Sequence, residues 1–194
     1  MKTFYLTSLL LTLGIASIAQ TEKGTINING QFGSNSGGQH SNISNGLIKS
    51  FSIELNPNVG FFVKDNWEVG AGVLFGMTRG RMSGYYTKSI SNSFGIQSYS
   101  KYYIGKKSVR PYVTLEAERI WLSEKTKFVN GNTQGYTSAS WNAGGGAGVA
   151  WFVTPKIGLF SQLTYNRDLE RQIKYSTGTL NLNFGVQVNL GKKK

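Results

Sequence analysis

The sequence predicts an all-β protein, an eight-stranded antiparallel up-and-down transmembrane β-barrel. Eight stretches alternate apolar and polar residues with a period of two, which is the pattern of strands that have one apolar face. The connections between these stretches are alternately long and short along the chain. Membrane barrels show this asymmetry, with tight turns at one end and longer loops at the other.

The chain begins with a segment typical of an export signal. Lys2 precedes the apolar run from Phe4 to Ile15, and small residues follow up to Ala19. A charged start, a short apolar stretch and a small-residue end make up a secretory signal peptide. The run is too short for a membrane anchor, the alternative interpretation. We expect a signal peptide at residues 1–19 and one outer-membrane β-barrel domain at residues 20–194.

Composition narrows the class further. The chain has no cysteine, which rules out a disulfide framework, and it has no second long apolar run, which rules out a helical membrane protein. Its formal net charge is +12, from 21 basic and 9 acidic residues. An exported protein seldom meets nucleic acid, so we expect no nucleic-acid partner. Anionic lipid headgroups or lipopolysaccharide phosphates are the expected partners, unless the charges are only solvated loop residues.

The clearest strands form a long hairpin, residues 50–78, in which two arms of alternating residues flank the polar turn 64–66. The arms exceed the usual five or six residues of a soluble strand and suit a tilted membrane-spanning strand. The other strands are expected at 25–33, 93–104, 109–122, 141–153, 157–166 and 179–190. Short turns then fall at 64–66, 105–108 and 154–156, and long loops at 34–49, 79–92, 123–140 and 167–178.

The composition of the two faces indicates which one meets lipid. The polar face consists mostly of Gly, Asn, Ser, Thr and Gln with few charges, which suits the crowded interior of a narrow barrel. A soluble barrel would place many charged residues there. We therefore expect the continuous apolar face to contact lipid. Because an unpaired strand edge is costly in lipid, the last strand must pair with the first.

Aromatic residues gather at both ends of the apolar face. Phe61, Trp67, Tyr102 and Trp151 lie beside the short turns, and Phe32, Phe51, Phe75, Phe94, Trp121, Trp141 and Tyr165 lie towards the long loops. Two such bands predict the aromatic girdles of the two membrane interfaces. The alternative is the general preference of strand ends for aromatic residues.

Charged residues on the polar face form the first candidate site. An eight-stranded barrel is just wide enough for its own side chains to fill, and isolated buried charges are costly, so inward charges should pair. The acidic candidates are Glu54, Glu68, Glu116 and Glu118, and the basic ones are Lys101 and Arg110. Glu68 and Lys101 lie near the same end of adjacent strands. We expect a structural ion-pair network that plugs the barrel, rather than a proton or ion path.

Basic residues near the long loops form a second candidate site. Arg79, Arg81 and Lys88 lie in the second long loop, and Arg119 lies on the apolar face of its strand near the loop end. These cations are candidates for contacts with lipopolysaccharide phosphates, with ordinary solvated loop charges as the alternative.

The sequence contains few residues that could form a catalytic or metal-binding site. Some small barrels modify lipid A with a His and a Ser, but His40, the only histidine, lies beside Ser41 in a polar loop without a nearby carboxylate. One histidine and no cysteine predict no metal site. We expect no enzyme activity and no cofactor.

Several segments resemble a known family, the small outer-membrane β-barrel domain of the OmpX and OmpA-barrel type. The resemblance rests on Ile53–Gly76, Phe94–Ile104, Arg110–Val113, Trp141–Gly144 and Phe152–Pro155. It is closest to the Bacteroidetes form, in which Gln often follows the signal, as Gln20 does here. The resemblance covers nearly all of the mature chain and implies insertion by the outer-membrane assembly machinery. The chain departs from the family in ending with Leu190, Gly191 and lysines in place of an aromatic residue.

The resemblance and the residues together predict a small integral outer-membrane protein with a side-chain-filled interior and an envelope-structural or surface-interaction role. Its termini are expected in the periplasm and its long loops outside the cell. Two alternatives remain: an accessory subunit of a larger outer-membrane complex, and a lipid A-modifying barrel enzyme. The protein is expected as a monomer or as a subunit of such a complex.

Overall fold

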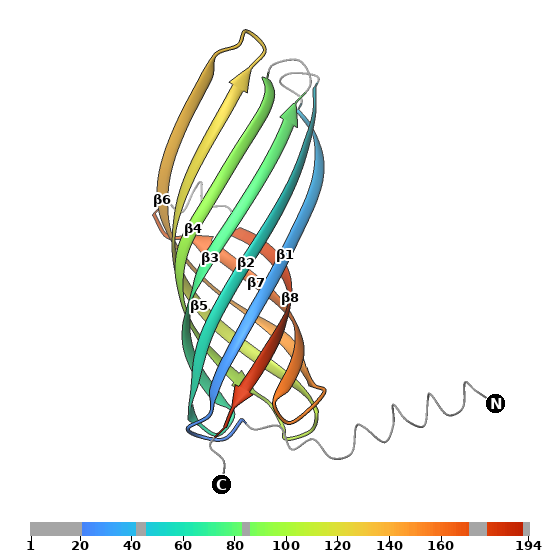
Figure 1. Cartoon of the computed structure of the whole chain (residues 1–194), viewed down its shortest axis with the longest axis vertical. Coiled ribbons are helices and arrows are strands. Elements are labelled where there is room, and N and C mark those ends of the chain that lie inside the picture. The colour runs from blue at the N-terminus through green and yellow to red at the C-terminus, as the bar shows by residue number, and fades with distance from the viewer. Residues whose placement is uncertain (1–20, 42–45, 83–85, 171–177, 192–194) are drawn as a thin grey trace, which may run out of the picture.

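The structure, a computed structural model, describes residues 21–41, 46–82, 86–170 and 178–191, with the side chains of all these except 34–41, 46–48, 82, 86 and 87. The described chain forms β1 (Ile26–Ser41), β2 (Gly46–Lys64), β3 (Trp67–Met82), β4 (Tyr86–Tyr103), β5 (Val109–Phe128), β6 (Thr133–Phe152), β7 (Ile157–Asp168) and β8 (Gly178–Leu190). Each strand is antiparallel to the next, and β8 pairs with β1 to close a barrel (Figure 1). The predicted fold class is confirmed.

The predicted faces and short turns also agree with the structure. Along β5, alternate residues from Arg110 to Glu118 are buried, and the residues between them are exposed on the outer wall. At the first short turn, Lys64 pairs with Trp67, and Asn66 adopts a positive φ of 64° that asparagine tolerates. We call the end of the barrel with the three short connections the turn end, and the opposite end the hairpin end.

The predicted long loops at 34–49, 79–92 and 123–140 are wrong, because most of these residues continue the strands. β1 and β2 stay in register from Ser34 and Ile53 up to Ser41 and Gly46, and β5 and β6 pair up to Lys127 and Thr133. Alternation disappears there because a wall outside lipid needs no apolar face, whereas backbone pairing continues without it. The fourth predicted loop does separate β7 from β8, and its residues 171–177 lie outside the described residues.

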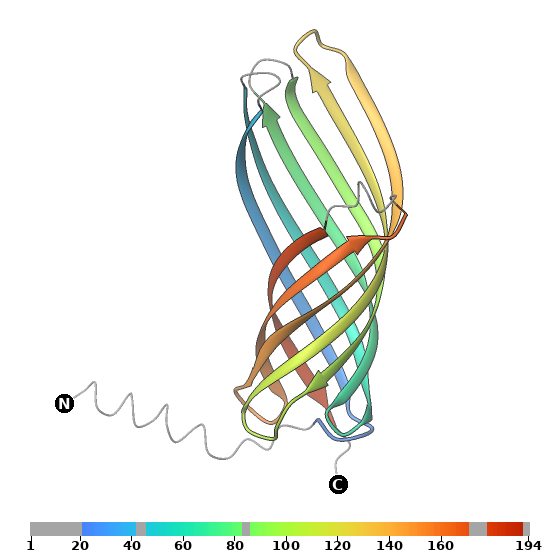
Figure 2. The same ribbon diagram turned by 180° about the vertical axis from the view of Figure 1, so that it is seen from behind.

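The wall of the barrel has two heights. β7 ends at Asp168 and β8 begins at Gly178, and both are short, whereas β1–β6 rise well beyond them (Figures 1 and 2). β7 pairs with β6 only from Asn142 onward, and β8 pairs with β1 only as far as Phe32. Among the described residues, β1 beyond Phe32 and β6 at residues 133–140 therefore have one strand edge without a partner. We call the part of β1–β6 above these points the projecting sheet.

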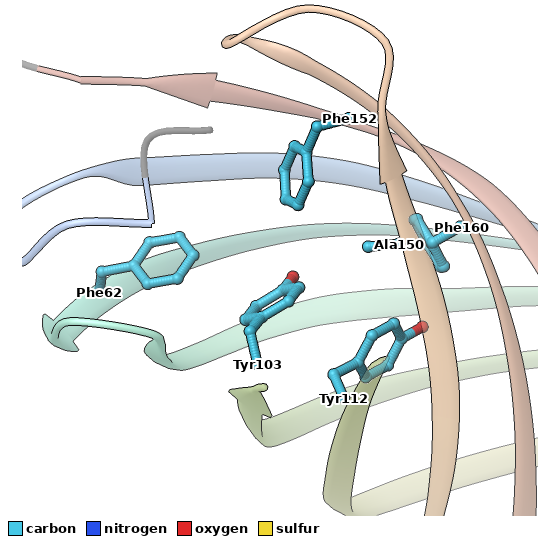
Figure 3. Close-up of a cluster of buried hydrophobic side chains, with 6 residues drawn as sticks. All are labelled: Phe62, Tyr103, Tyr112, Ala150, Phe152 and Phe160. Atoms are coloured by element: carbon cyan, nitrogen blue, oxygen red, sulfur yellow. The ribbon is translucent and has the colours of Figure 1, made fainter. Parts of the chain in front are cut away.

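Apolar side chains fill the interior at the turn end. Phe62, Tyr103, Tyr112, Ala150, Phe152 and Phe160 are at most 4% exposed and pack as one cluster inside the barrel (Figure 3). The ring centroids of Tyr103 and Tyr112 are 5.4 Å apart, a spacing typical of aromatic pairs. In the described chain, no helical segment has the length and apolarity needed to cross a bilayer.

Candidate functional site in the barrel interior

Glu68 is the centre of the interior polar network. Its side chain is fully buried, and its carboxylate accepts hydrogen bonds from three neutral side chains. The Asn27 amide donates to both oxygens at 3.0 Å, the Tyr99 hydroxyl donates at 2.6 Å and the Tyr103 hydroxyl at 3.0 Å. The donors come from β1 and β4, so the carboxylate ties β3 to its neighbour β4 and to β1, two strands away.

Lys101 lies directly across from Glu68 in the register of β3 and β4. The sequence predicts only that the two residues lie near the same end of adjacent strands. Its ammonium is surrounded by aromatic rings, with the centroids of Tyr112 and Phe160 at 4.7 and 4.9 Å from Nζ. In the described structure, no nitrogen–oxygen contact within 4 Å joins Lys101 to Glu68. The two charges therefore attract one another at a distance rather than through a direct contact.

Arg110 sits at the turn end, below the apolar cluster. Its guanidinium donates to the backbone oxygens of Lys106 and Lys107, to Thr21 Oγ1, and to Asn66 Oδ1 at 3.3 Å. The ring of Phe152 lies 5.2 Å away. Arg110 thus closes the base of the barrel by joining Thr21, just before β1, to two of the short connections.

Glu54, Glu116 and Glu118, the remaining predicted members, lie higher in the interior, around a cavity of about 680 Å³. Glu116 accepts hydrogen bonds from Gln97 at 3.1 Å and Asn166 at 2.9 Å, and Glu118 accepts one from Asn142 at 3.3 Å. The interior is therefore packed in its turn half and hollow in its hairpin half. The expectation that side chains fill the whole barrel is corrected: beyond the level of Gln97, short polar side chains leave the centre open.

The predicted girdle residues all lie on the outer wall. Their exposed fractions range from 43% at Trp121 to 54% at Tyr165, and the set comprises Phe32, Phe51, Phe61, Trp67, Tyr102, Trp151, Phe75, Phe94, Trp121, Trp141 and Tyr165. Phe94 contacts Phe75 and Trp121 laterally, with ring centroids 5.5 and 5.9 Å apart. The outer wall thus carries a continuous aromatic row over β3, β4 and β5 towards the hairpin end.

The predicted basic contacts divide into two groups. Arg79, Arg81 and Lys88 are exposed on the outer side of β3 and β4, in the projecting sheet. Arg119 instead forms an ion pair with Glu170 and stacks over the Trp141 ring at 5.3 Å. The Arg119 charge is therefore already neutralised within the chain.

Two further expectations from the sequence concern His40 and metal ligands. His40 belongs to β1, but its side chain lies outside the described residues. Over the described part of the chain, no group of three or more His, Cys, Asp or Glu residues is placed to hold a metal ion.

Sequence reasoning missed the neutral partners of these charges. These partners occupy inward-facing positions of their strands, as the predicted charges do, and the alternation of inward and outward positions was the available signal. They are Asn27, Tyr99, Tyr103, Gln97 and Asn166. Which of them touch depends on the curvature of the closed wall, which no local pattern reports.

Comparison with known proteins identifies the architecture. The family model described as outer membrane protein beta-barrel domain matches residues 6–192. No curated protein sequence matches the chain. A major outer membrane protein from Thermus thermophilus is similar at a TM-score of 0.51, with 10% identity over 87% of this chain and 100% of that chain. The N-terminal beta-barrel domain of Pseudomonas aeruginosa OprF has a TM-score of 0.50, with 16% identity over 87% and 98%.

Proposed function

The chain belongs to the family of outer-membrane proteins with a β-barrel domain, and from this premise we propose that it is a surface-interaction protein that binds through its projecting sheet. In this proposal, the turn end and both termini face the periplasm and the hairpin end faces outward. The barrel anchors the sheet and carries out no catalysis. Long hairpins at one end and tight turns at the other support this orientation.

The two wall heights carry the proposal. β5 continues seven residues beyond Trp121 to Phe128, about 23 Å along the strand at the usual rise per residue. A wall that served only to span the bilayer would end near the aromatic row. The extra length instead holds a stiff polar sheet above the membrane surface.

The free edge of β6 offers a specific mode of binding. Leu169 N donates to Trp141 O, so the backbone groups of Trp141 point towards β7. In an antiparallel strand, alternate residues point the same way, which places the backbone groups of Ala139 and Thr137 on the open edge. Such an edge binds an extended segment of another protein as an added strand.

Proline substitution on this edge tests the proposal. Thr137→Pro with Ala139→Pro removes two edge donors and leaves the β5 side of the ladder intact, because proline is tolerated on an edge. Thr137→Ala with Ala139→Val is the matched control. Cells that display each barrel are passed over immobilised extracellular proteins and polysaccharides. Retention on protein should depend on the barrel, be lost in the proline variant and persist in the control. Equal retention of both variants, or none from the wild type, would contradict the proposal.

The outward cations of the projecting sheet are proposed to contact lipopolysaccharide phosphates. Arg79, Arg81 and Lys88 are exposed beyond the aromatic row, whereas Arg119 is paired with Glu170. Replacing Arg79 and Arg81 with alanine should therefore weaken retention of lipopolysaccharide by the purified barrel more than Arg119→Ala does. Equal effects from the two changes would count against this assignment.

The two alternatives each have a direct test. An accessory subunit would purify from mild detergent with a stoichiometric partner, whereas a stand-alone barrel would migrate alone. A lipid A-modifying enzyme would change the mass spectrum of lipid A when the gene is deleted, and this alternative rests on His40 alone.

A further inference from the structure

We propose that the cavity in the hairpin half of the barrel binds a small organic polycation of the polyamine class. The chain carries a net charge of +12, yet six of its nine acidic residues line this one cavity: Glu54, Glu116, Glu118, Glu124, Asp168 and Glu170. Among the described residues, no lysine or arginine lines it. A cavity with walls of one sign concentrates ions of the opposite sign.

Within the described part of the chain, three of these carboxylates, Glu54, Glu118 and Glu124, have no ion-pair partner. Glu170 is paired with Arg119, and Lys101, below the cavity, attracts Glu116. Glu54 and Glu118 line the same cavity and carry like charges. Glu118 accepts a hydrogen bond from the neutral side chain of Asn142, and Glu124 accepts one from that of Thr126. The negative charge of Glu54, Glu118 and Glu124 is therefore offset least, and a bound cation would relieve their repulsion.

Buried neutral oxygens of the same cavity also lack donors. Gln97 is 7% exposed and Thr164 is 1% exposed, and both line the cavity. Within the described structure, Gln97 Oε1 and Thr164 Oγ1 have no hydrogen-bond partner. The Gln97 amide cannot simply be turned round, because its nitrogen donates to the Glu116 carboxylate at 3.1 Å. These oxygens carry almost no accessible surface, so a side-chain turn towards the cavity is needed before an ammonium group, with three donors and no acceptor, satisfies them.

The size and spread of the site favour an organic cation over a metal ion. The cavity of about 680 Å³ lies within the range of small-molecule sites. Its carboxylates come from β2, β5, β7 and the segment just after β7, and in the described chain no three of them gather as ligands of one ion. A linear molecule with several separated ammonium groups reaches dispersed carboxylates that a single ion cannot.

Titration of the folded full-length barrel with spermidine tests the assignment. Glu54→Gln with Glu118→Gln removes two cavity charges and keeps an acceptor for Asn142. Glu22→Gln with Asp65→Asn removes the same charge at the turn end and serves as the control. Calorimetry in detergent should show saturable spermidine binding to the wild type and the control, and binding at least tenfold weaker to the cavity variant. Heat-modifiable migration checks that each variant is folded.

Two outcomes would overturn the proposal, and neither bears on the projecting sheet. Absence of saturable binding to the wild type, or equal binding to both folded variants, would show that the cavity is not a polycation site. Magnesium binding as tight as spermidine binding, at matched ionic strength, would show that the carboxylates hold a simple ion. If the cavity variant does not fold, Glu118→Gln alone gives the same comparison against Glu22→Gln.

Discussion

Replacing Glu68 with glutamine should cost about 3–4 kcal/mol of barrel stability. Glutamine keeps the shape of the side chain but removes its charge and one of its two acceptor atoms. The structure shows three donors on the carboxylate, from Asn27, Tyr99 and Tyr103. One charge-assisted bond, at roughly 2 kcal/mol, is lost, and the other two weaken by roughly 0.5–1 kcal/mol each.

Lys101→Met completes a double-mutant cycle with Glu68→Gln. Alone it leaves the buried Glu68 charge without its nearest cation, at a cost of roughly 3–5 kcal/mol. With Glu68→Gln it removes both charges, so the double variant should lose at least about 1 kcal/mol less than the sum of the single losses. Additive losses would show that the two charges do not stabilise one another across the tyrosines, and would refute the reasoning.

Urea unfolding in lipid vesicles, followed by tryptophan fluorescence and heat-modifiable migration, measures these free energies. Glu124→Gln is the control, because Glu124 lies near the hairpin end and accepts one hydrogen bond, from Thr126 at 3.3 Å. Its loss should stay within about 0.5 kcal/mol, as for surface changes generally.

Two further changes test the wall itself, by the same unfolding measurement. Val73→Arg places a charge on the outer wall, where Val73 of β3 pairs with Ile96 of β4, and it should lower the free energy of unfolding by about 2–4 kcal/mol. Met77→Arg, beyond the aromatic row, should lower it by roughly 0–1 kcal/mol. Equal losses from the two changes would mean that the outer wall does not face lipid. Gly70→Ala sets a new Cβ 2.5 Å from Tyr99 Cζ and 2.6 Å from Val59 O, and should cost about 1–3 kcal/mol. Gly30→Ala, with no atom within 4 Å, should be nearly neutral, and a silent Gly70→Ala would show that Tyr99 moves freely away from Glu68.

The sequence predicts the fold because lipid imposes alternation on every strand that crosses it. Phe94 and Ile96 against Gln97 and Tyr99 already separate outside from inside, and the structure confirms this parity. Where lipid ends, the pattern ends too. Residues 133–140 have no apolar face, so they read as a loop although they form the open edge of β6.

The interior was predictable in part. The sequence places Glu68 and Lys101 near the same end of adjacent strands, and the structure puts them directly opposite one another. The contact of Glu68 with Asn27 joins β3 to β1 across the interior, and depends on how the closed wall curves. The sequence does not predict the cavity in the hairpin half, because the cavity depends on how far the inward side chains extend towards the barrel axis and not on which residues are polar.

The short seam between β1 and β8 has a consequence for how the protein folds. It joins Ile26 to Leu190 and runs only as far as Phe32, whereas every other seam links strands that are consecutive in the chain. Closing it requires almost the whole sequence to be present, and contacts between such distant residues form slowly. The hairpins can assemble first as an open, curved sheet with both edges unsatisfied. Closure of this seam is therefore the step that completes the barrel.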